Sequence, residues 1–211
     1  MKTTILRTIA ISVMIFLIQS AQAQFNYGVH AGLNIVTQAE MGELWNNCNS
    51  YHGYTVGGTL EYKTKSIISF QTELNYQKKG AKTDSESDGI TYVEKKEFNY
   101  LSVPLLIRAT INDKELGDKY SLTFFAGPYA GYLTSAHSRM NGGAEDYPVN
   151  LEDQAEKFDA GAIFGGGVIY KLNNGRAIVG ELRYEMGLKS IDKNDPDLRN
   201  KGIGFTAGYR F

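Results

Sequence analysis

Strict alternation of apolar and polar residues recurs along almost the whole chain, and it constrains the fold more than any other feature. The end of the chain shows it most clearly, because small or polar residues separate Ile203, Phe205, Ala207, Tyr209 and Phe211. A period of two is that of a β-strand with one apolar face. Seven further segments alternate in the same way, over about 25–35, 51–62, 66–77, 91–110, 120–133, 157–172 and 176–187. The sequence therefore predicts eight β-strands.

The predicted connections alternate between short and long. Short joins cover 63–65, 111–119 and 173–175, the last with the turn sequence Asn-Asn-Gly. Long polar joins cover 36–50, 78–90, 134–156 and 188–200. In an up-and-down meander, alternate joins lie at the same end, so one end would carry the short turns and both termini. An even number of strands, short turns at one end and long loops at the other are typical of outer-membrane barrels.

The opposite faces of the predicted strands are polar and charged. Asp159 lies on one of these faces, and seven other residues form a predicted charge network in the lumen: Glu61, Glu73, Arg108, Glu181, Arg183, Glu185 and Arg210. A soluble lipocalin-like barrel that binds an apolar ligand would show the same alternation, with its charged face in water. Alternation alone therefore does not separate a membrane barrel from a soluble one.

Three further features favour the membrane barrel. The strands run for about 10–12 residues, long enough to cross a membrane at a tilt. Tyrosines recur near the strand ends, as an interfacial aromatic girdle requires. The chain ends on Phe211, with Tyr209 on the same face, which is similar to the C-terminal signal that directs outer-membrane barrels to the barrel-assembly machinery. We predict an eight-stranded antiparallel up-and-down transmembrane β-barrel.

The start of the chain has the pattern of a secretory signal peptide. Lys2 and Arg7 precede an apolar run over 9–18, and the small residues Ala21 and Ala23 form a cleavage site. A run of roughly ten apolar residues is too short for a membrane anchor. We predict a signal peptide over residues 1–23 and a barrel domain over 24–211.

Composition excludes several classes of protein. Without Lys2 and Arg7, 20 of the 22 basic residues remain against 23 acidic ones, which does not suit a nucleic-acid binder. Cys48 is the single cysteine, so no internal disulfide can form. The three glycines at 165–167 lack the helix and the Lys-Ser/Thr pair of a phosphate-binding loop, and close packing of the barrel wall explains them better.

The sequence also lacks the usual signs of a metal site or an enzyme. His30 is predicted to face the lumen, but His52 and His137 belong to other elements, so we predict no metal and no cofactor. No convincing Ser/His/Asp arrangement is present. A lipid-modifying enzyme would need a group such as His52 or Ser66 at the membrane edge, and these residues lie at different ends of their strands. We therefore predict that the protein is not an enzyme.

Several segments together resemble a known family. They are "YGVHAGLN", "NYLSVPLLIR", "FFAGPYAGYL", "FDAGAIFGGGVIY", "ELRYEMGL" and "GFTAGYRF", in this order along the chain. Their order is similar to that in PorT-like proteins, a family of outer-membrane β-barrel proteins of Gram-negative bacteria. The resemblance implies an eight-stranded barrel in the outer membrane, in contact with its lipid. The founding member is linked to a protein secretion and gliding apparatus.

An eight-stranded barrel has an interior just wide enough for side chains to fill it. Charges of both signs are predicted in the lumen, and buried charges require partners. We therefore predict a structural or partner-binding barrel with a filled lumen, whose external loops contact a protein partner. The acidic loop Met140–Glu156 is one candidate for such a contact or for a cation. The alternative is a narrow transporter of ions or small solutes along the lumen charges.

Overall fold

A computed structural model describes residues 25–39, 49–87, 90–112, 117–141, 148–193 and 195–211. The predicted signal peptide over 1–23, with Ala21 and Ala23, lies outside the described residues, as does Cys48.

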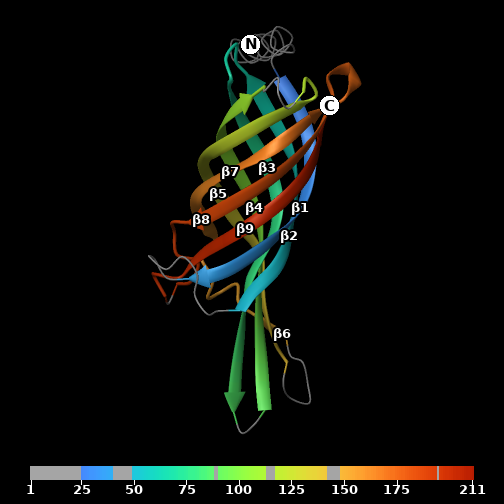
Figure 1. The fold of residues 1–211 in the computed structure, drawn as a ribbon. Helices are drawn as coiled ribbons and strands as arrows, with labels where there is room; N and C mark the ends of the chain where they lie inside the picture. The colour runs from blue at the N-terminus through green and yellow to red at the C-terminus, as the bar shows by residue number, and fades with distance from the viewer. Residues whose placement is uncertain (1–24, 40–48, 88–89, 113–116, 142–147, 194) are drawn as a thin grey trace, which may run out of the picture.

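Eight strands form a closed antiparallel barrel (Figure 1). Each strand pairs with its neighbour along the chain, and the last pairs with the first through twelve residue pairs from Gly28↔Arg210 to Ala39↔Arg199. The strands are β1 (Phe25–Ala39), β2 (Asn49–Lys63), β3 (Ile68–Ser87), β4 (Ile90–Ile111), β5 (Tyr120–Asn141), β7 (Phe158–Lys171), β8 (Ala177–Gly187) and β9 (Arg199–Arg210). The predicted eight-stranded barrel is confirmed. A ninth strand, β6 (Pro148–Asn150), pairs only with the outer part of β5.

The short connections lie at one end of the barrel, which we call the turn end; the other we call the loop end. Asn174 has φ 65° and Gly175 has φ 78° in the turn between β7 and β8. This left-handed conformation is the one that Asn and Gly tolerate best, so the predicted turn forms as expected. The start of β1 at Phe25 and the last residue, Phe211, both lie at the turn end (Figure 1).

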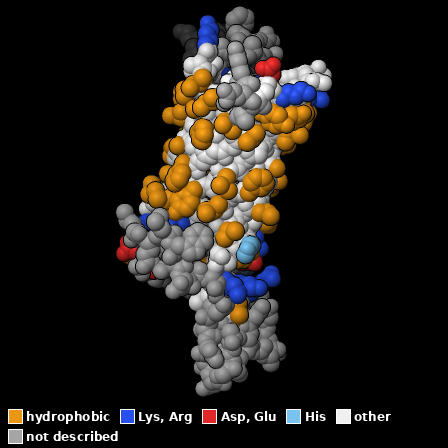
Figure 2. Space-filling view, viewed as in Figure 1, with side chains coloured by type: hydrophobic (Ala, Val, Ile, Leu, Met, Phe, Trp, Pro, Cys, Tyr) orange, Lys and Arg blue, Asp and Glu red, His pale blue; other side chains and the backbone are white. Residues whose placement is uncertain are grey.

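The outer surface of the barrel carries a broad hydrophobic band (Figure 2). Aromatic pairs from neighbouring strands mark its two edges: Tyr27–Phe211, Phe25–Tyr62 and Tyr120–Tyr170 at the turn end, and Tyr54–Tyr76 and Tyr132–Phe158 at the loop end. Such rings sit at the two interfaces of a membrane barrel. None of the described helical segments is long and apolar enough to cross a bilayer.

Two of the predicted long loops are wrong in extent. The join expected over 78–90 is largely strand, because β3 and β4 stay paired from Lys78↔Asn99 to Ser87↔Ile90. Much of the join expected over 134–156 is also strand, since β5 continues to Asn141. The β3–β4 hairpin projects beyond the rest of the barrel (Figure 1). The inner faces of these segments bury polar residues such as Lys79 and Ser138 as well as Phe98 and Ala136, so no regular apolar alternation marks them as strands.

Candidate functional site in the barrel lumen

The centre of the lumen is crossed by a two-pronged ion pair. Arg183 Nη1 and Nη2 donate to the two carboxylate oxygens of Glu73 at 2.7 and 2.8 Å. Glu73 lies on β3 and Arg183 on β8, which are four strands apart in either direction around the ring. Both side chains are almost completely buried. The pair therefore joins opposite walls of the barrel.

A second ion pair lies beside the first. Arg108 Nη2 donates to Glu181 Oε1 at 2.7 Å, and Arg183 Nε donates to the other oxygen of Glu181 at 3.0 Å. Both guanidinium groups lie over the ring of Phe125, with their central carbons 4.9 and 5.3 Å from its centroid. The central layer thus holds two arginines and two glutamates in one connected network.

Neutral side chains add further hydrogen bonds to this layer, while Arg108 Nε has no partner among the described residues. The side-chain amides of Gln71 and Asn75 donate to Glu73 at 2.6 and 2.8 Å. Arg108 Nη1 also donates to the Thr123 hydroxyl at 3.1 Å. Buried charges are tolerated when hydrogen bonds as well as counter-charges satisfy them, as they do at Glu73.

The turn end of the lumen holds a smaller charged group. Glu61 accepts hydrogen bonds from the Ser69 hydroxyl at 2.7 Å and lies 3.2 Å from Arg210 Nη1. Between this group and the turn end lies a cavity of about 600 Å³. Its lining includes five basic residues: Lys63, Lys65, Lys171, Arg176 and Arg210. The lumen is therefore accessible from this end only down to the Glu61–Arg210 pair.

A third group near the loop end centres on Lys79. Its ammonium lies 2.8 Å from Glu185 and 3.4 Å from Asp159. The side-chain amide of Gln77 donates to Glu185 at 2.8 Å, and that of Asn200 donates to Asp159 at 3.1 Å. The structure therefore joins all seven predicted lumen residues into ion pairs, and it adds Lys79 and Asp159. The predicted third strand stopped at residue 77, so Lys79 was missed, although its odd position continues the polar face.

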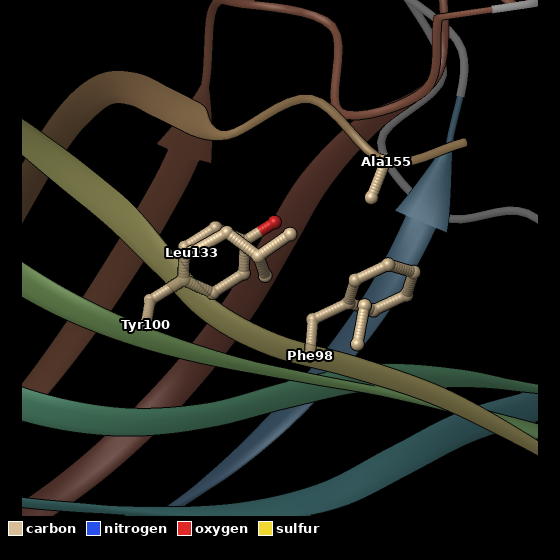
Figure 3. Close-up of a cluster of buried hydrophobic side chains, with 5 residues drawn as sticks. Phe98, Tyr100, Leu133 and Ala155 are labelled. Atoms are coloured by element: carbon tan, nitrogen blue, oxygen red, sulfur yellow. The ribbon is translucent and has the colours of Figure 1, made fainter. Parts of the chain in front are cut away.

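An apolar cluster covers the lumen beyond Lys79 (Figure 3). Phe98, Tyr100 and Leu133 point inward from β4 and β5, and Ala155 reaches them from the segment after β6. The Leu151 amide donates to the Ala136 carbonyl at 3.1 Å, which ties this segment to the barrel wall. Among the described residues, this buried cluster therefore covers the loop end of the lumen.

The space left between these layers is small. The cavities beside Arg183 have volumes of about 30 and 20 Å³, each close to the space that one water needs. His30 borders the first of these cavities, and neither of its ring nitrogens has a hydrogen-bond partner among the described residues. Its Nε2 lies 4.0 Å from Glu73. Within the described residues, no three His, Cys, Asp or Glu side chains are grouped to hold a metal.

The two predicted assembly-signal residues lie together at the turn end. Phe211 stacks on Tyr27 with 5.3 Å between ring centroids, and it meets Tyr209 edge-on at 5.0 Å. Its backbone amide donates to the Tyr27 carbonyl at 3.0 Å. The last residue therefore extends the seam where the barrel closes.

Comparison with known families decides where such a barrel belongs. A family model described as the outer membrane protein beta-barrel domain matches residues 19–193, which is most of the chain. The chain belongs to this family. It is an integral outer-membrane protein, and the predicted outer-membrane location is confirmed.

Three solved structures match the chain with low sequence identity and with TM-scores below 0.5. Neisserial surface protein A is 11% identical, with 87% of this chain and 95% of that chain covered and a TM-score of 0.49. Ail of Yersinia pestis is 15% identical, with 89% and 99% covered and a TM-score of 0.43. OprG of Pseudomonas aeruginosa is 11% identical, with 89% and 96% covered and a TM-score of 0.47. None of the curated proteins matches the sequence significantly. At these identities and TM-scores, the similarity says nothing about ligands or partners.

Proposed function

We propose that this protein is a closed-lumen barrel that anchors an extracellular binding surface in the outer membrane. The observation that supports this is the ion pair between Glu73 and Arg183, which joins opposite walls at the centre of the lumen. Beyond the turn-end cavity, the cavities beside this pair hold about one water each, and the apolar cluster lies at the loop end. A barrel filled in this way serves as a rigid scaffold rather than as a pore.

The part of the molecule available to a partner is the paired extension of β3, β4, β5 and β6 beyond the hydrophobic band (Figure 1). Val149 on β6 is 53% exposed there, and because it lies outside the hydrophobic band, contact with membrane lipid does not account for its exposure. A single exposed apolar side chain is normal on a protein surface, so Val149 serves here as a position from which contacts of the extension can be probed. We propose this extension as the partner-binding part, in place of the long external loops expected from the sequence.

We further propose that the chain is PorT-like, acts as an accessory of protein secretion and is not an enzyme. The order of the segments from "YGVHAGLN" to "GFTAGYRF" along the chain supports the PorT-like assignment.

We also propose cleavage after Ala23 and recognition of the C-terminal strand by the barrel-assembly machinery. N-terminal sequencing of the protein from outer membranes checks the cleavage, with Gln24 as the expected first residue.

Conductance measurements test the closed lumen. The purified protein is reconstituted in planar bilayers beside a general porin as positive control, and the expected result is no conductance step. Reproducible steps in the wild-type protein would contradict the proposal and favour the narrow transporter, with ions passing between Glu73 and Arg183.

Crosslinking in living cells tests the partner-binding role. A photo-reactive amino acid replaces Val149 at the loop end, and the matched control replaces Lys65 in the turn between β2 and β3. We expect a discrete protein adduct at position 149 and none at position 65. The absence of any adduct at 149, in cells that assemble the barrel normally, would leave a purely structural role.

A further inference from the structure

The cavity at the turn end of the lumen is large enough for a small molecule. Its volume of about 600 Å³ is typical of pockets that bind small ligands, whereas the cavities beside Arg183 hold about one water each. The Glu61–Arg210 pair lies at its inner end. Because the short turns of outer-membrane barrels lie on the periplasmic side, the cavity faces the periplasm. A soluble molecule of the periplasm can therefore enter it.

Two lysines reach this cavity from opposite walls of the barrel. Lys63 lies at the end of β2 and Lys171 at the end of β7, four strands apart in either direction around the ring. Glu61 and Ile169 are buried on the inner face of these strands. Each lysine lies two residues further along, so alternation places both on the same inner face. The two ammonium groups lie close enough to repel each other. An anion held between them therefore interacts with both.

Neutral groups position Lys171 at the cavity. Its ammonium donates to Asn112 Oδ1 at 2.8 Å and to the backbone carbonyl of Asp118 at 3.5 Å. The Ser121 hydroxyl donates to the same Asn112 oxygen at 2.7 Å. Both side-chain bonds use the oxygen of the Asn112 amide, so its Nδ2 group is left as a donor without an acceptor among the described residues. The lining thus carries a cation and a neutral donor side by side, and both suit an anion.

Basic residues outnumber acidic ones in the described lining of the cavity. Glu61 is the one acidic residue there, and Arg210 Nη1 lies 3.2 Å from it. The other basic residues come from the β2–β3 and β7–β8 turns and the strand ends beside them: Lys63, Lys65, Lys171 and Arg176. None of these four forms an ion pair with a carboxylate of the described residues. A cleft lined mainly by one sign of charge concentrates ligands of the opposite sign.

We propose that this cavity binds a soluble periplasmic molecule that carries two or more phosphate or carboxylate groups. Lys63 and Lys171 bind its anionic groups from opposite walls, and Asn112 adds a neutral donor. Each ammonium is a compact charge with three donors, which suits oxygen-rich anions. The site goes beyond the proposed extracellular surface, since it lies at the opposite end of the closed lumen.

The test compares two double variants with the same change in charge. Lys63→Gln with Lys171→Gln removes the two cavity lysines. Lys119→Gln with Lys157→Gln removes one lysine in the turn before β5 and one near the loop end, and neither lines the cavity. Both proteins are purified in detergent and confirmed as folded by their change in gel mobility on boiling. Binding of pyrophosphate and of citrate is measured by titration calorimetry at two salt concentrations.

We expect the wild type to bind at least one of the two anions, and the cavity variant to bind it at least tenfold more weakly. The control variant should bind like the wild type. Lys63→Arg with Lys171→Arg keeps both charges and should retain binding. Wild-type binding should weaken as salt rises. Binding of neither anion by the folded wild type, or equal binding by the two glutamine variants, would overturn the proposal.

Two other probes separate a soluble anion from a lipid headgroup. Short-chain phosphatidylglycerol carries the phosphate of a membrane lipid, and glucose is the neutral control. Both should bind the wild type far more weakly than pyrophosphate or citrate. Tighter binding of the phospholipid, lost in the cavity variant, would overturn the assignment to a soluble molecule. None of these outcomes affects the closed lumen, which the conductance measurement tests by itself.

Discussion

Arg183 and Glu73 lie 110 residues apart in the sequence and form two parallel hydrogen bonds of 2.7 and 2.8 Å across the barrel. Because they belong to opposite strands, they fix the barrel cross-section at its centre. Bidentate pairing of a guanidinium with a carboxylate is among the strongest side-chain interactions. In this barrel the ion pair lies at the centre of the lumen, where a soluble domain would have hydrophobic side chains.

Arg183→Met should destabilise the barrel strongly, because it leaves Glu73 buried without its counter-charge. Breaking a buried ion pair by removing one partner costs about 3–5 kcal/mol. The measurement is the temperature at which the folded band is lost on SDS gels. The double variant Glu73→Gln with Arg183→Met removes both charges and should recover much of the loss. An unchanged temperature for the single variant would contradict a structural role for the pair.

The barrel and its charged lumen could be predicted because they depend on strand period. Every second residue of a membrane strand must be apolar, so the odd or even position of Glu73, Arg183 and Arg210 fixed their facing. The partners of these charges could not be predicted, since Arg183 contacts Glu73 only when β8 lies opposite β3. That relation depends on the closure of the whole ring.

The loop end was predicted less well than the lumen. From Lys78 onward the inner face of β3 and β4 buries the charged Lys79 as well as the apolar Phe98, so no regular apolar period marks these parts of the strands. The apolar cluster was missed for a different reason. Ala155 and Leu151 belong to no long strand, and their burial against Phe98 results from the path of the chain after β6.

Gly165 should not tolerate a larger side chain, in contrast to Gly180 on the neighbouring strand. A Cβ atom at Gly165 would lie 2.2 Å from the Leu182 carbonyl oxygen and 2.7 Å from the Phe125 ring. At Gly180 nothing lies within 4 Å of such an atom. Gly165→Val should therefore abolish or greatly reduce the heat-modifiable band, while Gly180→Val should preserve it. Equal folding of both variants would show that the wall at Gly165 is not packed closely.

Phe211→Ala should reduce assembly in cells more than stability in detergent. The ring contacts with Tyr27 and Tyr209 are each worth about 0.5–1.5 kcal/mol, a modest part of barrel stability. If the assembly machinery recognises Phe211 as a signal, the substitution would instead change the amount of protein inserted into the outer membrane. The amount of folded protein in outer membranes should fall several-fold, while refolding yield in detergent changes little. Tyr120→Ala, which removes an aromatic pair with Tyr170 at the same end, is the control. A parallel fall in both measurements, or the same loss for Tyr120→Ala, would argue against a C-terminal signal.

Acid should loosen the extension of β3 and β4 through Glu97, which lies outside the hydrophobic band. Burial alone would raise the pKa of Glu97, but hydrogen bonds from Lys78 and Tyr51 outweigh it and hold the pKa below its ordinary value. A carboxyl group with a lowered pKa stabilises the folded state above its unfolded pKa, and that contribution is lost as pH falls through the folded value. The partly exposed pair is worth at most ~1 kcal/mol, or roughly a fivefold change in opening.

Hydrogen exchange of the backbone amides over 93–98 checks this, after correction for intrinsic rates. Protection should be constant from pH 7 to about pH 5 and should fall below it, because the unfolded carboxyl titrates near pH 4.3. Glu97→Gln should lower protection at pH 7 and flatten the acid response, since it removes the group whose pKa changes. Glu94→Gln, which changes the neighbouring carboxylate on the inner face, should leave most of the acid response in place. An acid response unaltered by Glu97→Gln would assign the loosening to other carboxylates of the extension.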